Sequence, residues 1–296
     1  MEEKKVSPEE VKRLKGLGFL RDKRYGDRFN VRVVTGNGKI SSVKARAIAD
    51  AADRFGSGEV AMTTRQTQEI QCVPYENVDA LREYLAQYGL ETGGTGPKVR
   101  PVVSCKGTTC TFGLIDTYGL SEKIHVRFYQ GMHDVKLPHK FKIAVGGCPN
   151  NCVKPELNDV GIIGQRYPSV DTDQCRGCNV CQVAMACPVK AASAVSGKLV
   201  IDEDACNHCG RCAGKCPFGA HTVGEAGYRI WVGGRWGKKT AVGRPLHRFF
   251  TSEEEVLDMI EKLITVYREN GQEGERFAET IDRIGFETLE KLLGIE

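Results

Sequence analysis

Hydrophobic positions in the first part of the chain change between a period of two and helical spacing. Residues 29–33 alternate apolar and polar side chains, which predicts a half-buried strand. Helical spacing covers residues 42–55 and 78–88, and a glycine ends each segment. A shorter helix begins at the capping sequence Ser7-Pro-Glu-Glu and ends near Gly16. This order of elements predicts an α+β fold.

A second extended segment, residues 59–73, is unusual because its centre is polar. The residues 63–69 read Thr-Thr-Arg-Gln-Thr-Gln-Glu, where a structural strand would carry apolar side chains. Near the other end, residues 228–232 predict a strand, and two helices are predicted near 252–269 and 273–293. The strand at 228–232 indicates that the sheet begun earlier is completed late in the chain.

Composition narrows the class of protein. The chain has 296 residues, 41% hydrophobic and 27% charged, with a net charge of +4, which is typical of a soluble globular protein. This small charge gives no indication of nucleic-acid binding, and no stretch is long and apolar enough to predict a membrane span. The first ten residues lack the apolar segment of a signal peptide, so we expect a cytoplasmic protein.

The thirteen cysteines are grouped. Eight lie within residues 175–216 in two similar runs, and four form two earlier pairs. Cys72 stands alone and is expected to be a small buried hydrophobe. Cytoplasmic thiols stay reduced, so metal ligation is a better explanation than disulfides. The crowding of eight cysteines predicts a small module inserted into a larger domain.

The second run, residues 206–217, is the cysteine run of bacterial ferredoxins, ending in Cys-Pro. The first run, residues 175–188, has two extra residues before its last cysteine but keeps the same ending. The fourth cysteine of such a run ligates the other cluster of the pair. The crossed sets for two [4Fe–4S] clusters are therefore Cys175, Cys178, Cys181 and Cys216, and Cys206, Cys209, Cys212 and Cys187.

Structural zinc is the alternative for these eight cysteines, but it does not require the doubled run with Cys-Pro ends. The ferredoxin interpretation predicts electron transfer within the chain. The acidic and basic side chains of residues 168–222 balance, so composition marks no docking face for a donor. His208, between two ligand cysteines, is expected to be incidental.

The earlier pairs, Cys105/Cys110 and Cys148/Cys152, could bind zinc or a third cubane cluster. Basic residues flank them in otherwise uncharged segments, although each alone could be a solvated surface cation. Together they favour a cluster beside an anion site. They are Arg32 on the first strand, Arg65 in the polar segment, Arg100 before Cys105, and Lys140 and Lys142 before Cys148.

These motifs resemble those of the siroheme sulfite and nitrite reductases. The matching pieces are Thr63-Thr-Arg-Gln-Thr-Gln, the two cysteine pairs, residues 137–152, and shorter pieces at 228–234 and 243–246. The likeness covers almost the whole chain and is strongest to the anaerobic sulfite reductase catalytic subunit and to short dissimilatory-like sulfite reductases. It implies a ferredoxin-like half of the reductase repeat at 1–75, a siroheme and [4Fe–4S] domain at 76–167, an inserted two-cluster ferredoxin domain at 168–222, and completion of the siroheme domain with C-terminal helices at 223–296.

The resemblance also implies roles for individual residues. A [4Fe–4S] cluster would be held by Cys105, Cys110, Cys148 and Cys152, and the Cys152 sulfur would be shared with the siroheme iron. Arg65 would pair with siroheme carboxylates, with Thr64 and Gln66 of the same motif beside the cofactor. The anion would be bound on the distal side of the macrocycle by Arg32, Arg100, Lys140 and Lys142. One departure is that four residues, where the family usually has five, separate Cys105 from Cys110.

The implied activity is the six-electron reduction of sulfite to sulfide, with electrons relayed through the ferredoxin module. Nitrite reduction to ammonia uses the same cofactors and is one alternative, and a non-catalytic electron-transfer subunit is another. No nicotinamide or flavin fingerprint is evident, which predicts a separate electron donor protein or subunit. The chain has one copy of a repeat that family enzymes use twice, so we expect a homo-oligomer or a complex with related subunits.

Overall fold

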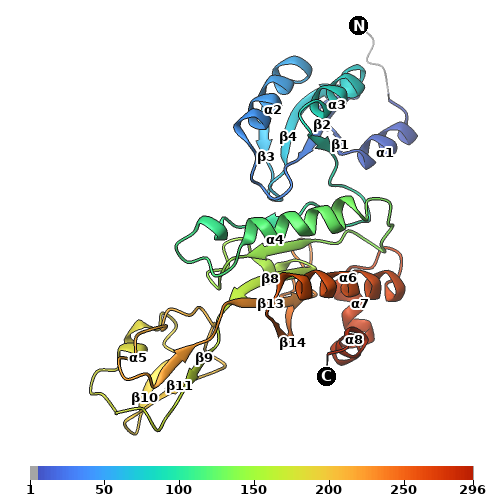
Figure 1. The fold of residues 1–296 in the computed structure, drawn as a ribbon. Helices are drawn as coiled ribbons and strands as arrows, with labels where there is room; N and C mark the ends of the chain where they lie inside the picture. The colour runs from blue at the N-terminus through green and yellow to red at the C-terminus, as the bar shows by residue number, and fades with distance from the viewer. Residues whose placement is uncertain (1–5, 296) are drawn as a thin grey trace.

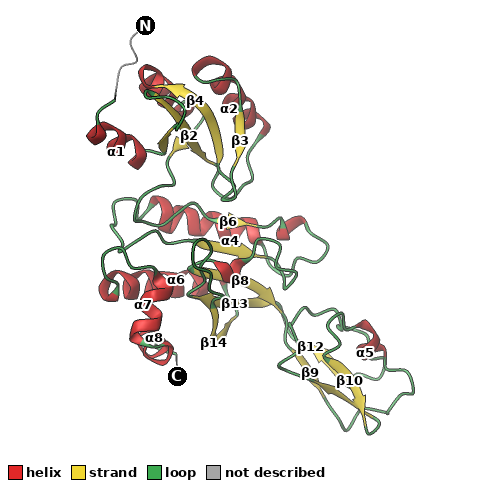
Figure 2. Cartoon of the chain, turned by 180° about the vertical axis from the view of Figure 1, so that it is seen from behind, coloured by secondary structure: helices red, strands yellow, loops and turns green. Residues whose placement is uncertain are grey.

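The computed structural model describes residues 6–295, which form an N-terminal domain, a central domain and a projecting module (Figure 1). The module extends away from the central domain on the side opposite the N-terminal domain, as the reverse view also shows (Figure 2). Within the described residues, no helix combines the length and the apolar composition required to cross a bilayer.

The N-terminal domain is an antiparallel sheet of order β1-β2-β4-β3, with β5 paired to β2. Its strands are β1 (Phe19–Arg21), β2 (Arg28–Val34), β3 (Val60–Met62), β4 (Gln68–Pro74) and β5 (Glu91–Thr92). Its helices are α1 (Pro8–Gly16), α2 (Ser42–Phe55) and α3 (Val78–Ala86), with a short 3-10 turn, η1 (Tyr75–Asn77), before α3. The predicted strand at 29–33 and the helices at 42–55 and 78–88 are confirmed.

The alternating pattern of β2 and the helical pattern of α2 place their apolar side chains in one core. Phe29, Val31 and Val33 point to one face of β2 and are fully buried, where they meet Ala47 and Ile48 of α2. The prediction of one extended segment at 59–73 is wrong in its centre. The polar residues form the turn of a β3–β4 hairpin, in which Gln66 has a positive φ of 60°. The side chains of this turn bond to one another or to the central domain and do not face the core of the sheet, which explains the polar stretch.

The boundary predicted after residue 75 is also wrong, because the first core continues beyond it. Val78, Leu81, Leu85 and Leu90 pack into the same cluster as β2 and α2. The N-terminal domain therefore runs through β5, and α3 covers its sheet rather than opening the next domain.

The central domain contains a five-stranded sheet of order β14-β13-β8-β7-β6. Strands β6, β7 and β8 are parallel, and β8, β13 and β14 are antiparallel. The bounds are β6 (Val103–Ser104), β7 (Ile143–Gly146), β8 (Val160–Gln165), β13 (Gly227–Val232) and β14 (Arg244–Phe250). Short 3-10 turns, η2 (Gly107–Thr109) and η4 (Pro155–Leu157), come after β6 and before β8 respectively.

Helices bury the apolar strands of this sheet. Helix α4 (Thr117–Ile124), which continues as a π-helical turn η3 (His125–Gln130), packs against β6 and β7. Helix α6 (Glu253–Asn270) buries Val256, Ile260 and Leu263 in the same core as Ile143 and Ile162. The single helix predicted near 273–293 is instead α7 (Phe277–Ile284) and α8 (Phe286–Leu293), because Gly285 between them has a φ of 89°.

The module lies between β8 and β13. Two small antiparallel pairs form it, β9 (Pro168–Val170) with β12 (His221–Val223) and β10 (Ala192–Val195) with β11 (Lys198–Ile201), together with helix α5 (Gln182–Ala186). Gln165 at the end of β8 pairs directly with Gly227 at the start of β13. The insertion therefore leaves the central sheet continuous.

An aromatic contact fixes the module to the central domain. The centroids of the His208 and Tyr167 rings lie 4.0 Å apart, and Tyr167 contacts Phe249 of β14 edge-on at 4.7 Å. The backbone N–H of Arg166 donates to the His208 carbonyl at 2.9 Å. His208, expected to be incidental, is therefore part of the junction.

A buried ion pair joins the sheet to the C-terminal helices. The Arg276 guanidinium, at the start of α7, donates to both carboxylate oxygens of Asp159 at 2.9 Å. The Lys142 backbone N–H donates to the same carboxylate at 2.9 Å. The side chains of Arg276 and Asp159 are 5% and 0% exposed. Neither charge can be hydrated if the other is removed.

We predict that Arg276→Ala lowers the free energy of unfolding of the central domain by about 3–5 kcal/mol, because it leaves a buried carboxylate without its partner. Urea unfolding of the anaerobic protein measures the change. The matched control is Arg268→Ala, whose arginine pairs with Glu269 at the surface and is half exposed. This control is expected to change the free energy of unfolding by about 0.5 kcal/mol or less. Equal effects of the two substitutions would contradict the role of the buried pair.

Candidate functional site

The two groups of predicted site residues lie at opposite ends of parallel strands. Arg100 precedes β6, and Cys105 comes directly after it. Lys142 directly precedes β7, and Cys148 comes after it and Gly147. Since β6 and β7 run in the same direction, the cations gather at the amino ends and the cysteines at the carboxyl ends. At about 3.3 Å per residue, roughly 15–20 Å of backbone separates them.

Arg32 and Arg100, two of the cations at the amino ends, have few hydrogen-bond partners. The Arg32 guanidinium pairs with Glu69 at 3.1 Å, from β2 to β4. Arg100 donates to the Gly94 carbonyl, while its Nε is buried with no hydrogen-bond partner among the described residues. A buried guanidinium N–H without a partner indicates that an acceptor belongs there.

Arg65 reaches from the hairpin turn into the central domain. Its guanidinium donates to the Pro101 carbonyl at 3.2 Å, to the Ile143 carbonyl at 3.2 Å and to Asn158 Oδ1 at 3.0 Å. The side chain thus fastens the N-terminal domain to the starts of β6 and β7. Thr64, its neighbour, is exposed at the tip of the turn.

Burial and mutual repulsion act together on these cations. Burial lowers the pKa of Arg65 to about 10, and the charges of Arg100, Arg276 and Arg32 contribute to that shift. The pKa of Arg100 is likewise lowered to about 10, first by burial and then by Arg32. Burial, with the charges of Arg65, Arg276 and Lys140, lowers the pKa of Lys142 to about 8. The pKa of Lys140 is also lowered, first by burial and then by Arg276 and Arg100.

The acids in this cluster do not neutralise it. Glu69 is paired with Arg32, and Asp159 with Arg276. Burial raises the pKa of the Asp159 carboxyl, and Arg276 opposes that shift. The arrangement brings Arg32, Arg65, Arg100, Lys140 and Lys142 together in a partly dehydrated region with unmatched positive charge, which favours a bound anion.

Sequence reasoning missed Arg276 and Asp159. Arg276 lies in a polar Gly-Glu-Arg stretch, and Asp159 comes after an Asn at the start of a strand, so both resembled surface residues. A hydrophobic pattern carries no signal for a charge that becomes buried against a distant partner.

At the carboxyl ends, the central set of cysteines, Cys105, Cys110, Cys148 and Cys152, lines one cavity of about 570 Å³. The short loop between Cys105 and Cys110 contains the turn η2, and Cys110 still reaches the cavity. Gln66 lines the cavity too, with its side-chain amide bonded to the backbone of Ser104 at 2.7 and 2.8 Å. Cys152 is the exposed member of the set.

Glycines let the two cysteine loops approach each other. A Cβ on Gly147 would lie 2.8 Å from the Gly107 Cα, closer than two carbon atoms can pack. The Gly147 N–H donates to the Cys105 sulfur at 3.1 Å. Larger residues at either position would separate the loops and open the cysteine set.

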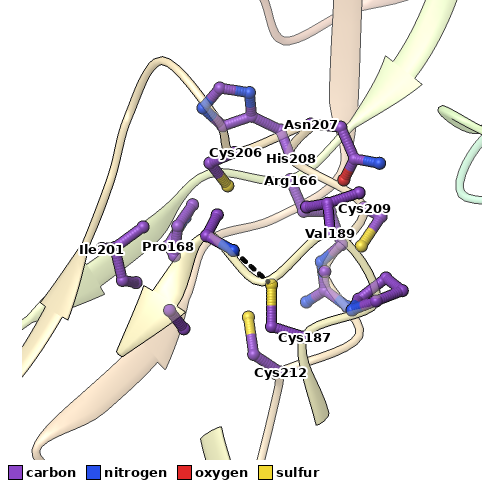
Figure 3. Close-up of a pocket in the computed structure, with 14 residues that line it drawn as sticks. Arg166, Pro168, Cys187, Val189, Ile201, Cys206, Asn207, His208, Cys209 and Cys212 are labelled. Atoms are coloured by element: carbon purple, nitrogen blue, oxygen red, sulfur yellow. Dashed lines mark hydrogen bonds between the residues drawn. The ribbon is translucent and has the colours of Figure 1, made fainter. Parts of the chain in front are cut away.

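In the module, the cysteines line two cavities in the crossed arrangement predicted from the runs. The inner set, Cys187, Cys206, Cys209 and Cys212, lines one cavity, and Figure 3 shows its sulfur atoms turned toward a shared space. The outer set, Cys175, Cys178, Cys181 and Cys216, lines the other. Among the described residues, no group of three or more His, Cys, Asp or Glu side chains is placed to hold a single metal ion.

Backbone N–H groups point at sulfurs in both module sets. Ala191 donates to the Cys187 sulfur at 3.2 Å (Figure 3) and Leu199 to the Cys175 sulfur at 3.3 Å. Hydrogen bonds from Gly177 and Leu199 lower the pKa of the Cys175 thiol. Such bonds stabilise thiolates, the form that ligates iron.

The inner set faces the central set. A cavity of about 370 Å³ is lined by Cys206 and His208 of the module and by Pro149 and Asn151 from the loop between Cys148 and Cys152. On the same side, the Arg211 guanidinium lies 4.4 Å from the ring centroid of Phe112, two residues after Cys110. The three sets therefore lie in the order outer, inner, central.

Comparison with known families matches this architecture. Residues 95–296 match the nitrite and sulphite reductase 4Fe-4S domain, and residues 21–88 match the nitrite/sulfite reductase ferredoxin-like half domain. The chain belongs to the nitrite and sulphite reductase family. The boundary between the two matches agrees with a first domain that ends after β5 rather than at residue 75.

Relatives and solved structures of this family include several sulfite reductases. The chain is 33% identical to the coenzyme F420-dependent sulfite reductase of Methanocaldococcus jannaschii over 81% of its length, but spans only 38% of that protein. It is 30% identical to a subunit of the anaerobic sulfite reductase of Salmonella typhimurium, covering 74% of this chain and 68% of that one. The crystal structure of dissimilatory sulfite reductase I superposes with a TM-score of 0.72 at 25% identity, over 92% of this chain and 70% of that chain.

We predict that the crossed sets bind separate clusters. Cys216→Ser should remove the outer cluster and spare the inner one, although Cys216 belongs to the second run. Cys187→Ser should do the reverse. Each substitution should lower the iron content by up to about four atoms per chain.

Iron analysis and electron paramagnetic resonance of the reduced anaerobic protein measure both changes. Cys72→Ser is the control, because Cys72 is buried in the N-terminal domain and lines neither cavity. If Cys216→Ser removed the signal that Cys206→Ser also removes, the crossed assignment would be wrong.

Proposed function

We propose that this chain reduces sulfite to sulfide as one repeat of a siroheme-dependent reductase. The supporting observation is that one pair of parallel strands carries an anion-favouring cation cluster at its amino ends and a four-cysteine set at its carboxyl ends. Membership of the nitrite and sulphite reductase family supplies the reaction class.

The residues present fit siroheme. Its carboxylates need cations, and the cluster has positive charge without matching acids, together with the orphaned Arg100 Nε. Cys152, which is exposed at the cavity of the central set, would be the residue that holds the siroheme iron. When bound, siroheme would supply the redox-active iron at which the anion is reduced.

One chain provides half of each of two such sites. Its cations and its cysteines are separated by roughly 15–20 Å of backbone, at opposite ends of the strands, whereas the two faces of one macrocycle lie only a few ångströms apart. A second repeat, from another copy of this chain or a related subunit, brings cysteines to these cations and cations to these cysteines. This pairing accounts for a chain with a single repeat.

Lysines and arginines perform the protein's share of the chemistry. Sulfite reduction consumes six electrons and releases the three oxygens as water, so negative charge builds on each departing oxygen. Lys140, Lys142 and Arg100 hold the dianion and stabilise that charge. Lys142, with its pKa lowered to about 8, releases a proton more readily than an ordinary lysine and is suited to protonate a departing oxygen.

The order of the cysteine sets supports a relay. The outer set is furthest from the central domain, and the inner set shares a cavity with the loop of the central set. The three sets would hold clusters in a row that could carry electrons from the outer set toward the central set. The His208–Tyr167 contact keeps the inner set against the central domain.

Nitrite reduction at the same site is the second candidate within enzymes. A small oxyanion that needs the same cations would bind equally well, and the family description names both substrates. A non-catalytic subunit is disfavoured, because the central set of cysteines and the anion-binding cations are all present.

The deciding experiment uses the anaerobically purified holoprotein. We expect siroheme absorption bands, about thirteen irons per chain from three cubane clusters and one siroheme, and sulfide release with a reduced viologen dye. The same assay with nitrite gives the substrate preference. Loaded protein that lacks siroheme bands, or that has them but reduces neither anion, would overturn the proposal.

We predict that Lys140→Ala and Lys142→Ala each lower kcat/KM for sulfite by about 10- to 150-fold, because each removes a charged hydrogen bond that contributes about 1.5–3 kcal/mol. Siroheme content should stay unchanged, because Arg65 and the other arginines of the cluster remain to pair with its carboxylates. Lys136→Ala is the control, since Lys136 is 73% exposed and pairs with Glu273 at the surface.

The loss of kcat/KM caused by Lys142→Ala should depend on pH. Lys142 is charged below its pKa of about 8 and neutral above it. The kcat/KM of the wild type divided by that of Lys142→Ala should therefore fall between pH 7 and pH 9. The titration of sulfite affects both proteins and cancels in this ratio. A ratio that stays constant across that range would show that the charge of Lys142 does not act on the anion.

A further inference from the structure

The outer cysteine set lies where a partner can reach it. Cys178 is exposed, and the module that carries it projects from the rest of the chain (Figures 1 and 2). The inner set, in contrast, faces the central domain. An electron entering through the module therefore meets the outer set first.

The surface over the outer set has a distinct charge. The residues that line this cavity include three exposed cations, Arg176, Lys198 and Lys215, and no acid. The Lys198 ammonium donates to the Thr172 and Cys175 carbonyls at 2.8 Å, and the nearby Asp171 carboxylate accepts from Asp173 and Gln174. The overall balance of charge in the module conceals this local excess.

At the inner end of the module, the basic Arg211 contacts the central domain and acidic residues lie nearby. Arg211 stacks on Phe112 of the central domain. The acids Asp202, Glu203 and Asp204 lie just before Cys206, and Asp204 lines the cavity that faces the central domain. Three of the five basic residues of the module, Arg176, Lys198 and Lys215, therefore line the outer cavity.

Exposed apolar side chains accompany the cations. Val180 is 59% and Phe218 is 43% exposed, and both line the outer cavity. The Arg176 guanidinium lies 5.0 Å from the Phe218 ring centroid. Apolar groups surrounded by cations are the composition of a small protein–protein contact.

We propose that this outer face, defined by Arg176, Val180, Lys198, Lys215 and Phe218, docks an acidic one-electron carrier protein of ferredoxin type. The inference rests on the proposed function and names its electron donor. Opposite charges increase the rate of encounter, and the apolar pair shortens the path to Cys178. At each encounter the carrier is oxidised by one electron and the outer cluster is reduced by one, and no covalent bond changes.

The test measures binding and turnover separately. The double variant Arg176→Glu/Lys215→Glu is compared with wild type for binding of an oxidised, acidic two-cluster ferredoxin, by calorimetry at low salt. We expect Kd to rise at least about tenfold, and the wild-type Kd to rise with added salt. The matched control is Lys190→Glu, an exposed lysine of the same module that lines neither cysteine cavity, and its Kd should stay within about twofold.

Iron content and paramagnetic signals establish that each variant keeps its clusters. In turnover, the double variant should lower the ratio of ferredoxin-driven to viologen-driven sulfide formation, because the small dye needs no docking face. An unchanged Kd in a cluster-replete double variant, or an equal loss in Lys190→Glu, would overturn the proposal.

Failure of the proposed function gives a different result. If the wild-type protein bound the ferredoxin through this face but formed no sulfide with either donor, the docking site would stand and sulfite reduction would fall. If sulfide formed with the dye but the ferredoxin neither bound nor reduced the protein, sulfite reduction would stand and the docking site would fall.

Discussion

The carboxylate of Asp159 holds together the charged end of the central sheet. It belongs to the segment entering β8, accepts two hydrogen bonds from Arg276 at the start of α7, and accepts a third from the backbone of Lys142 before β7. Without this buried anion, Arg276, Lys142 and Arg65 would repel one another in a region of low dielectric constant. The single negative charge of Asp159 thus allows several positive charges to lie close together. Because it offsets only part of them, the remaining positive charge attracts a further anion.

Parallel strands impose the second constraint. The residues before β6 and β7 must gather at one edge of the sheet, and the residues after these strands must gather at the other. The sequence order of cation, strand and cysteine occurs twice, at Arg100–Cys105 and at Lys142–Cys148. The fold therefore separates the cations from the central cysteine set within a chain, and makes pairing of repeats a geometric requirement of the proposed activity.

Local patterns predicted much of this arrangement. The helices at 42–55 and 78–88 and the strand at 29–33 result from periodicity, and the cysteine spacing predicted the crossed sets that line the two module cavities. The errors arose at positions whose structure depends on contacts with residues far away in the sequence. The polar centre of 59–73 is a turn docked on another domain, α3 packs backward onto the first sheet, and Gly285 breaks a helix whose apolar pattern continues across it. The partnership of Arg276 with Asp159 spans 117 residues, which no local pattern records.

The cross-strand pairing of Gln165 with Gly227 has a consequence for the central sheet. Because the entry and exit of the module are neighbours in one antiparallel ladder, a tight hairpin could join them without disturbing either strand. A longer connection between the two strands costs more conformational entropy to close, but this cost grows only slowly with its length. The register of the central sheet is therefore independent of the length and content of the segment inserted at this point.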